Sequence, residues 1–146
     1  MIAKGQKIPS VTIKQATAED GADVDPAVLF AGKKVVMFSL PGAFTPPWSE
    51  KHLPGYVAKL PDLKAAGVDL VACLSVNDAW VMKAWAEQHQ ALGKITMLAD
   101  GSGAFTKAHQ TALLTGAVVF GVLLQVLGWA TIGAGGVAGI QGMSGW

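Results

Sequence analysis

The sequence predicts an α/β domain in which helices flank a central sheet. Two continuous apolar runs with β-branched members, Lys34–Leu40 and Val68–Val76, are typical of strands buried on both faces of a parallel or mixed sheet. Helical patterns follow each run, and strands that alternate with helices predict this class. The charged residues are confined to the first part of the chain, since none follows Lys107, and this distinguishes the domain from the residues after it.

The first elements of the expected sheet are weak in sequence. The alternation Val11-Thr-Ile-Lys14 predicts a short edge strand. Residues 15–28 are polar, and Glu19-Asp-Gly21 predicts a turn within them. The strand Lys34–Leu40 then ends at Pro41-Gly42, because proline and glycine punctuate regular structure.

A helix is expected from about Trp48, with Pro46-Pro47 at its entry. Proline costs nothing there, since the N–H that it lacks would be unpaired in the first turn. We expect this helix to be interrupted near Pro54-Gly55 and a second helix to cover Pro61–Ala66. Gly67 would end that second helix.

The next helix begins after Asn77-Asp78, whose side chains are suited to capping it. The three-and-four spacing places Val81, Ala84, Trp85 and Gln88 on one face. Trp80 and Trp85 are both predicted to anchor the core rather than to form a binding platform. A third strand is expected at Ile95–Leu98, and Gly101-Ser-Gly103 opens another short helix.

The turn from the strand into the helix at residue 48 is the candidate functional site. Such a turn points several backbone N–H groups and the positive end of a helix dipole at one spot, which suits a reactive anion such as a thiolate. The residue placed there is Trp48, which carries no nucleophile. Its indole is predicted to fill the space at this spot, although a role in stacking against a ligand stays open.

The stretch Ser39–Tyr56 resembles the active-site segment of the peroxiredoxins, specifically the peroxiredoxin-5 (type II) branch. The family signature of Pro, three residues, Thr, two residues and Cys falls on Pro41, Thr45 and position 48. The resemblance covers residues 5 to 109 approximately, with further matching blocks at 29–34, 76–78, 81–85 and 93–101. It narrows the expected fold to the thioredoxin-like fold, a central mixed sheet flanked by helices.

The resemblance implies thiol-dependent reduction of hydrogen peroxide and alkyl hydroperoxides through a sulfenic acid. It implies a thiol donor (glutaredoxin, thioredoxin or glutathione), no cofactor, and a location in the cytoplasm or an organellar stroma or matrix. In the family Pro41 shields the peroxide pocket, Thr45 makes hydrogen bonds in it, and position 48 is the peroxidatic cysteine. A homodimer remains open.

This chain departs from the family pattern in three respects. Trp48 replaces the peroxidatic cysteine, all 11 basic residues are lysine so that the family's arginine is missing, and the pattern is lost after His109. Lysine lacks the planar fork of donors that arginine offers. The prediction is a peroxiredoxin-like protein that is inactive as written, in which Thr45 caps the helix and Pro41 ends the strand.

The remaining reactive side chains predict no second site. Cys73, the single cysteine, lies in an apolar strand and is expected to be buried and inert, which excludes an intramolecular disulfide or a cysteine-based zinc site. His52, His89 and His109 show no ligand spacing. A net charge of +1 without a basic stripe argues against a nucleic-acid partner, and the N-terminus lacks the apolar core of a signal peptide.

Residues 110–146 form an uncharged, apolar, Gly-rich tail after the predicted redoxin domain, residues 1–109. Within it, residues 112–131 are long and apolar enough to span a bilayer as a helix. The alternative function is therefore a non-catalytic redoxin-fold protein tethered to a membrane by this segment. A retained intron or a shifted reading frame would also produce such a composition, and these origins stay open.

Overall fold

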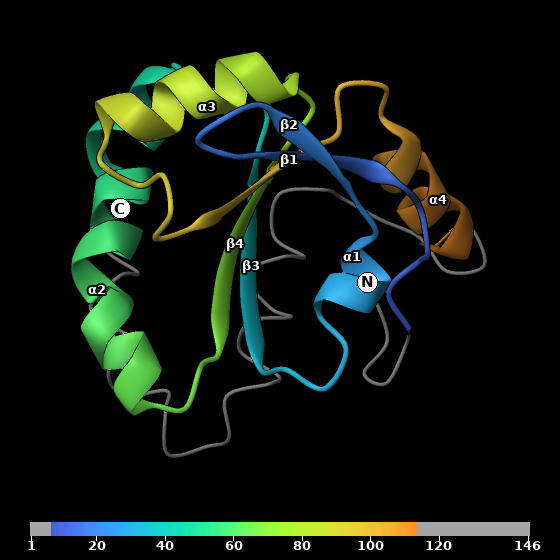
Figure 1. Ribbon diagram of the computed structural model, residues 1–146, viewed down its shortest axis with the longest axis horizontal. Helices are drawn as coiled ribbons and strands as arrows, with labels where there is room; N and C mark the ends of the chain where they lie inside the picture. Colours follow the sequence, from blue (N-terminus) through green and yellow to red (C-terminus); the bar gives the residue numbers. More distant parts are fainter. Residues whose placement is uncertain (1–6, 114–146) are drawn as a thin grey trace.

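The computed structural model describes residues 7–113, which form a five-stranded mixed sheet flanked by helices (Figure 1). The strand order is β2-β1-β5-β4-β3. Strands β3, β4 and β5 pair in parallel, and β1 pairs antiparallel with both of its neighbours, β5 and β2. The strands are β1 (Ile13–Ala16), β2 (Gly21–Val24), β3 (Val35–Leu40), β4 (Leu70–Ser75) and β5 (Thr96–Ala99). The helices are α1 (Pro26–Leu29), the π-helical η1 (Trp48–His52), α2 (Leu53–Ala65), α3 (Ala79–Gln88) and α4 (Ala104–Leu113).

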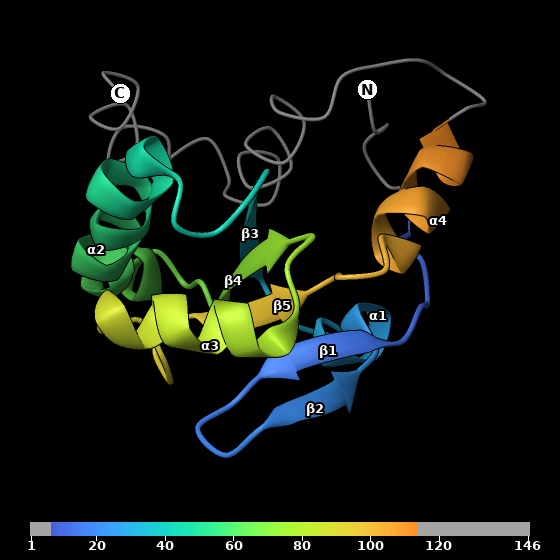
Figure 2. The same cartoon turned by 90° about the horizontal axis from the view of Figure 1, so that it is seen from above.

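Each face of the sheet carries its own apolar core, because successive strand residues point to opposite faces. On one face α2 and α3 cover the cross-strand row Phe38, Cys73 and Met97. On the other face Phe105 of α4 packs with Leu98 of β5 and with Phe30, which directly follows α1. Figure 2 shows α4 on the opposite side of the sheet from α2. The strands predicted at Lys34–Leu40 and Val68–Val76 are present as β3 and β4. Strand β4 is buried on both faces as predicted, whereas β3 lies at an edge of the sheet and alternates between buried and half-buried residues. The α/β class follows from the two covered faces of the sheet.

The N-terminal strands differ from the prediction. A single edge strand was expected at Val11-Thr-Ile-Lys14, whereas β1 lies between β2 and β5 and β2 forms the edge. The expected turn is present and leads directly into β2. A Cβ atom on Gly21 would lie 2.7 Å from the Cβ of Ala79, so β2 packs against the start of α3 at a distance that only glycine permits.

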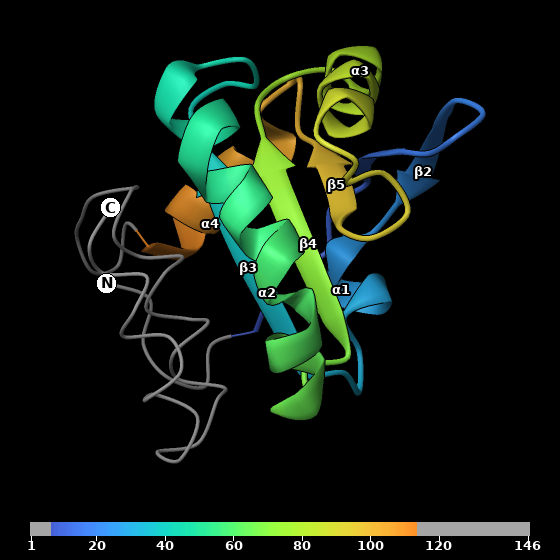
Figure 3. The same ribbon diagram turned by 90° about the vertical axis from the view of Figure 1, so that its left-hand side faces the viewer.

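The predicted break in the helix at Pro54-Gly55 is wrong. Helix α2 runs without interruption from Leu53 to Ala65 along β3 and β4, with Pro54 in its first turn (Figure 3). The widened π-helical turn of η1 precedes it, and Leu53 N donates to Trp48 O, five residues back. A proline ring clashes with the carbonyl four residues earlier in a regular α-helix, and the wider turn removes that conflict.

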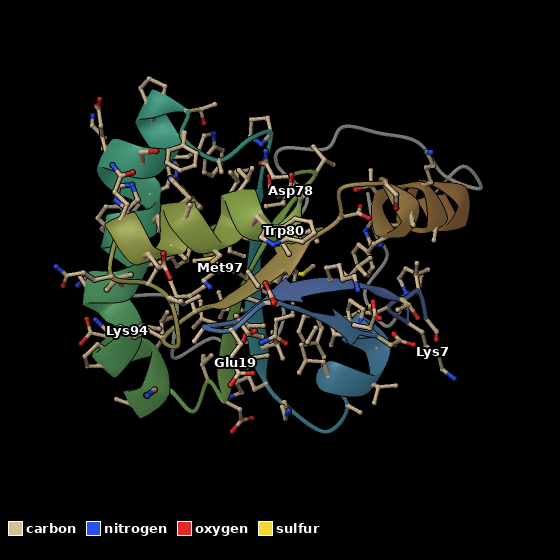
Figure 4. All side chains as sticks on the ribbon, turned by 45° about the horizontal axis from the view of Figure 1, so that its top comes forward. Lys7, Glu19, Asp78, Trp80, Lys94 and Met97 are labelled. Atoms are coloured by element: carbon tan, nitrogen blue, oxygen red, sulfur yellow. The ribbon has the colours of Figure 1, made fainter. Side chains whose placement is uncertain are left out.

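Only one of the two tryptophans expected in the core is there. Trp85 is completely buried, as predicted, whereas Trp80 is 69% exposed (Figure 4). Five positions separate the two residues, which is about 140° around a helix of 3.6 residues per turn. The two side chains therefore cannot both face the sheet. The predicted cap is confirmed, since the Asp78 carboxylate accepts from Val81 N at 2.8 Å.

Helix α4 begins after the buried Asp100, whose carboxylate accepts from the amides of Phe105 and Thr106. It continues through Leu113 and so runs across the predicted domain limit at residue 109. The rest of the predicted tail, including all but the start of the candidate membrane segment 112–131, lies outside the described residues. Over the part of the chain that the structure describes, no helix is long and apolar enough to cross a membrane.

Candidate functional site

The candidate site lies at the carboxyl ends of β3 and β4, where the loop 41–45 leaves the sheet. Asn77, two residues beyond β4, holds this loop in place. Its Oδ1 atom accepts from Ala43 N at 2.8 Å and from Ser75 Oγ at 2.7 Å. The sequence interpretation gave Asn77 only a capping role. A polar amide directly after a buried strand was the signal for this second role.

The loop has a strained backbone at Phe44. Its φ of 63° lies in the left-handed region, which costs a non-glycine residue about 1–2 kcal/mol. Hydrogen bonds at Ala43 and Thr45, the residues on either side, hold this conformation. Pro41 is exposed at the start of the loop, directly after the last residue of β3.

Thr45 joins the loop to the helix differently from the prediction. Its hydroxyl donates to Gly42 O at 2.8 Å, while its backbone carbonyl accepts from Ser49 N at 3.0 Å. The hydroxyl therefore braces the loop, and the expected cap on a helical N–H is replaced by this bond. Pro47 contributes to this difference, because it lacks one of the two N–H groups, those of the second and third helical residues, that a capping hydroxyl can bind. The spot facing the helix N-terminus is correspondingly poorer in donors than expected.

Trp48 occupies the first position of η1, half-buried. Its indole stacks on the imidazole of His52, with ring centroids 4.2 Å apart and 30° between the planes, and it also packs against the core beneath α2 and α3. Burial, with a smaller contribution from the Lys51 charge, lowers the pKa of His52. The structure thus brings Pro41, Thr45 and Trp48 into one turn, and its position 48 presents an aromatic surface.

The residue after Trp48 ties the turn to α3. Ser49 Oγ accepts a hydrogen bond of 2.9 Å from the indole Nε1 of the buried Trp85. No local pattern predicts this contact, because the two residues are distant in the chain and neither belongs to a recognisable spacing.

Cys73 is inaccessible, as predicted. It lies in the middle of β4 without solvent exposure, and burial raises the pKa of its thiol well above the usual value. The neighbouring Phe38 is covered by the ring of Tyr56, stacked at 3.9 Å. A neutral, enclosed thiol cannot serve as a nucleophile.

The mixed sheet, its helices on both faces and the strand-to-helix turn at position 48 define a redoxin domain of the thioredoxin-like fold. The sequence profile of the Redoxin family matches residues 3–123. The structure resembles reduced Prx3 from Vibrio vulnificus in complex with hydrogen peroxide, at 57% identity and a TM-score of 0.69, covering 74% of this chain and 68% of that one. The chain belongs to the peroxiredoxin family.

Two further relatives agree with the branch expected from the sequence. Peroxiredoxin 5 from Alvinella pompejana is 34% identical with a TM-score of 0.63, over 74% of this chain and 68% of that one. Peroxiredoxin-2E, chloroplastic, of Arabidopsis thaliana is 43% identical over 107 residues, which is 72% of this chain. This chain spans only 46% of the length of that chloroplastic relative. The family match reaches past His109 to residue 123.

Proposed function

We propose that this chain is a non-catalytic member of the peroxiredoxins, whose family reaction is the thiol-dependent reduction of hydrogen peroxide and alkyl hydroperoxides. The single observation that carries the proposal is Trp48 at the position of the peroxidatic cysteine. The family reaction needs a thiolate there to attack the O–O bond, which leaves a sulfenic acid on the sulfur and releases water or an alcohol. An indole provides neither the electron pair nor the acceptor for that oxygen.

Two further observations support the proposal. The single thiol of the chain, that of Cys73, is enclosed in the middle of β4, and burial favours its neutral form. The chain also has no arginine, and a lysine ammonium is a point charge that cannot form the two parallel hydrogen bonds of a guanidinium. Pro41 and Thr45 retain structural roles, since one follows the last residue of β3 and the other braces Gly42.

Peroxide consumption tests the proposal. The full chain, supplied in turn with glutathione, glutaredoxin and thioredoxin systems, should consume hydrogen peroxide no faster than its Cys73→Ser variant. Saturable turnover that the Cys73→Ser variant loses would overturn the proposal and move the chemistry to Cys73. Saturable turnover that survives in that variant would overturn it as well.

Exposed apolar side chains beside the turn support a homodimer as the partner of this surface. Phe44 is 49% exposed and Val76 48% exposed, on the two sides of the contact between Ala43 and Asn77, and Trp80 follows them. Large exposed apolar groups that gather in one region mark interaction surfaces. Sedimentation of the full chain against a Trp80→Lys variant tests this, and a dimer unaffected by that change would exclude Trp80 from the interface.

A second candidate function is tethering of the redoxin domain to a membrane. Its support is the sequence of residues 112–131, which is apolar over about the length that a spanning helix requires. The chloroplastic relative supports an organellar compartment, with the cytoplasm as the alternative. Co-flotation of the full chain with lipid vesicles tests the tether, and a chain that stays at the bottom of the gradient would exclude it.

A further inference from the structure

A groove of about 520 Å³ opens at the amino ends of β4 and β5, at the opposite end of these parallel strands from the Trp48 turn. Four segments line it: residues 15–18 after β1, part of α2, residues 68–71 leading into β4, and residues 92–96 leading into β5. Its volume lies within the range of small-molecule sites. No residue of the candidate site described above belongs to it.

The floor of the groove is apolar and consists of core residues. Its deepest side chains are all buried in the core and belong to the sheet, to α2 and to the two loops: Ala16, Leu60, Val68, Val71 and Ile95. Leu92 adds a half-buried wall. A floor of this kind is suited to the hydrocarbon body of a ligand, which gains by leaving water.

The rim of the groove is positively charged. Lys64 on α2 and Lys94 on the loop before β5 line it (Figure 4 labels Lys94). Within residues 7–113 neither ammonium makes a hydrogen bond or an ion pair. Among the described residues the lining also holds one carboxylate, that of Asp69, whose Oδ2 accepts from Lys34 N at 2.7 Å. The rim therefore carries two positive charges and one negative charge above an apolar floor.

We infer that this groove binds an amphipathic carboxylate with a hydrocarbon chain. The chain lies on the floor formed by Leu60, Val71 and Ile95, and the carboxylate lies between Lys64 and Lys94. The two ammonium groups are compact point charges that do not require the planar bidentate geometry of arginine, which suits a single carboxylate. This inference is independent of the proposed function, because the groove shares no residue with the Trp48 turn.

Titration of the isotopically labelled full chain with decanoate tests the site. We expect saturable amide shifts in residues 68–71 and 92–96. The double variant Lys64→Glu/Lys94→Glu should bind at least about tenfold more weakly, since a hydrogen bond to a charged group contributes that much. The matched variant Lys33→Glu/Lys51→Glu makes the same change in net charge away from the groove and should keep the affinity. Equal affinity in the two double variants, or shifts confined to other segments, would overturn the inference.

A ligand series on the unmodified chain keeps the test independent of how the variants fold. Affinity should rise from hexanoate through octanoate to decanoate, by up to about fourfold for each methylene that leaves water. Decanol, which has the same chain without the charge, should bind at least about tenfold more weakly than decanoate for the same reason as the lysine variant. Decanol that binds as tightly as decanoate, or an affinity independent of chain length, would contradict the site.

Discussion

The indole Nε1 of Trp85 donates a hydrogen bond of 2.9 Å to Ser49 Oγ, which joins α3 to the residue next to Trp48. Trp85 has no solvent exposure, so its N–H finds no water if Ser49 is removed. This hydrogen bond therefore anchors the first turn after the loop to the core of the domain.

Ser49→Ala should destabilise the fold by about 1–3 kcal/mol, because it leaves the buried N–H of Trp85 without an acceptor. Urea unfolding of the single variants and of the Ser49→Ala/Trp85→Phe double variant measures the coupling. In the Trp85→Phe background the serine change should cost little. Strictly additive costs would show that the hydrogen bond contributes nothing.

Asn77→Ala should destabilise the chain and loosen residues 42–45. The substitution removes the acceptor of both Ala43 N and Ser75 Oγ, at a cost of about 1–3 kcal/mol for groups left unpaired. Asn77→Asp is the matched control, since it keeps an oxygen at the same place. Hydrogen exchange at Ala43 that is equally slow in all three proteins would rule out this role for Asn77.

Tyr56 should ionise only in strongly alkaline solution. It is the single tyrosine of the chain, and burial, with a smaller contribution from Cys73, raises its pKa to about 12 from 10.0. The unfolded chain loses this proton at a lower pH than the folded chain does. The contribution of Tyr56 to the free energy of unfolding is therefore fully present below about pH 10 and is lost as the pH rises towards 12. Ultraviolet titration of tyrosinate, followed alongside circular dichroism, measures both. Ionisation near pH 10 in a folded chain would contradict the packing against Phe38.

Trp48→Cys in a Cys73→Ala background should restore a reactive thiol but little peroxidase turnover. The helix N-terminus should lower the thiol pKa only modestly, because Pro46 and Pro47 supply no N–H. Without the arginine, turnover should remain at least about 100-fold below that of active relatives, the typical cost of losing one preorganised donor. Thiol alkylation against pH and peroxide consumption are the measurements, with Trp48→Ser as the control. Rates equal to those of active relatives would show that arginine is dispensable here.

The full chain should need detergent to stay dispersed, and truncation after Leu113 should remove that need. The segment 112–131 is apolar at nearly every position, and such a surface drives membrane association or aggregation when it is exposed. Sedimentation of the full and truncated chains, each with and without detergent, makes the comparison. A full chain that is monomeric without detergent and resists proteolysis through residue 130 would show that the tail is folded into the domain.

The sequence predicted those parts of the fold that depend on local pattern. The apolar runs predicted β3 and β4, and Asp78 predicted the start of α3, because strand burial and helix capping leave local signals in the sequence. It failed where tertiary context decides. Trp80 and Trp85 are equally apolar, and only the rotation of α3 against the sheet buries one of them. Pro54 is a helix breaker by composition, and the preceding π-helical turn accommodates it.

The same division holds for the candidate site. Spacing placed Pro41, Thr45 and Trp48 in one turn, because all three lie within a short stretch of chain. The contacts that position the turn come from Asn77 and Trp85, in later elements. Such long-range contacts depend on the order of strands in the sheet, which a single sequence does not specify.

The π-helical turn at Trp48–His52 also constrains how this protein can change in evolution. A hydrogen bond that spans five residues, as from Leu53 N to Trp48 O, amounts to one extra residue in an otherwise regular helix. Deleting one residue between 49 and 52 would restore regular α-helical geometry, yet it would carry position 48 about 100° around the helix axis. Substitution at position 48 therefore preserves the architecture of the turn, whereas the loss of a single codon beside it would redirect whatever side chain stands there.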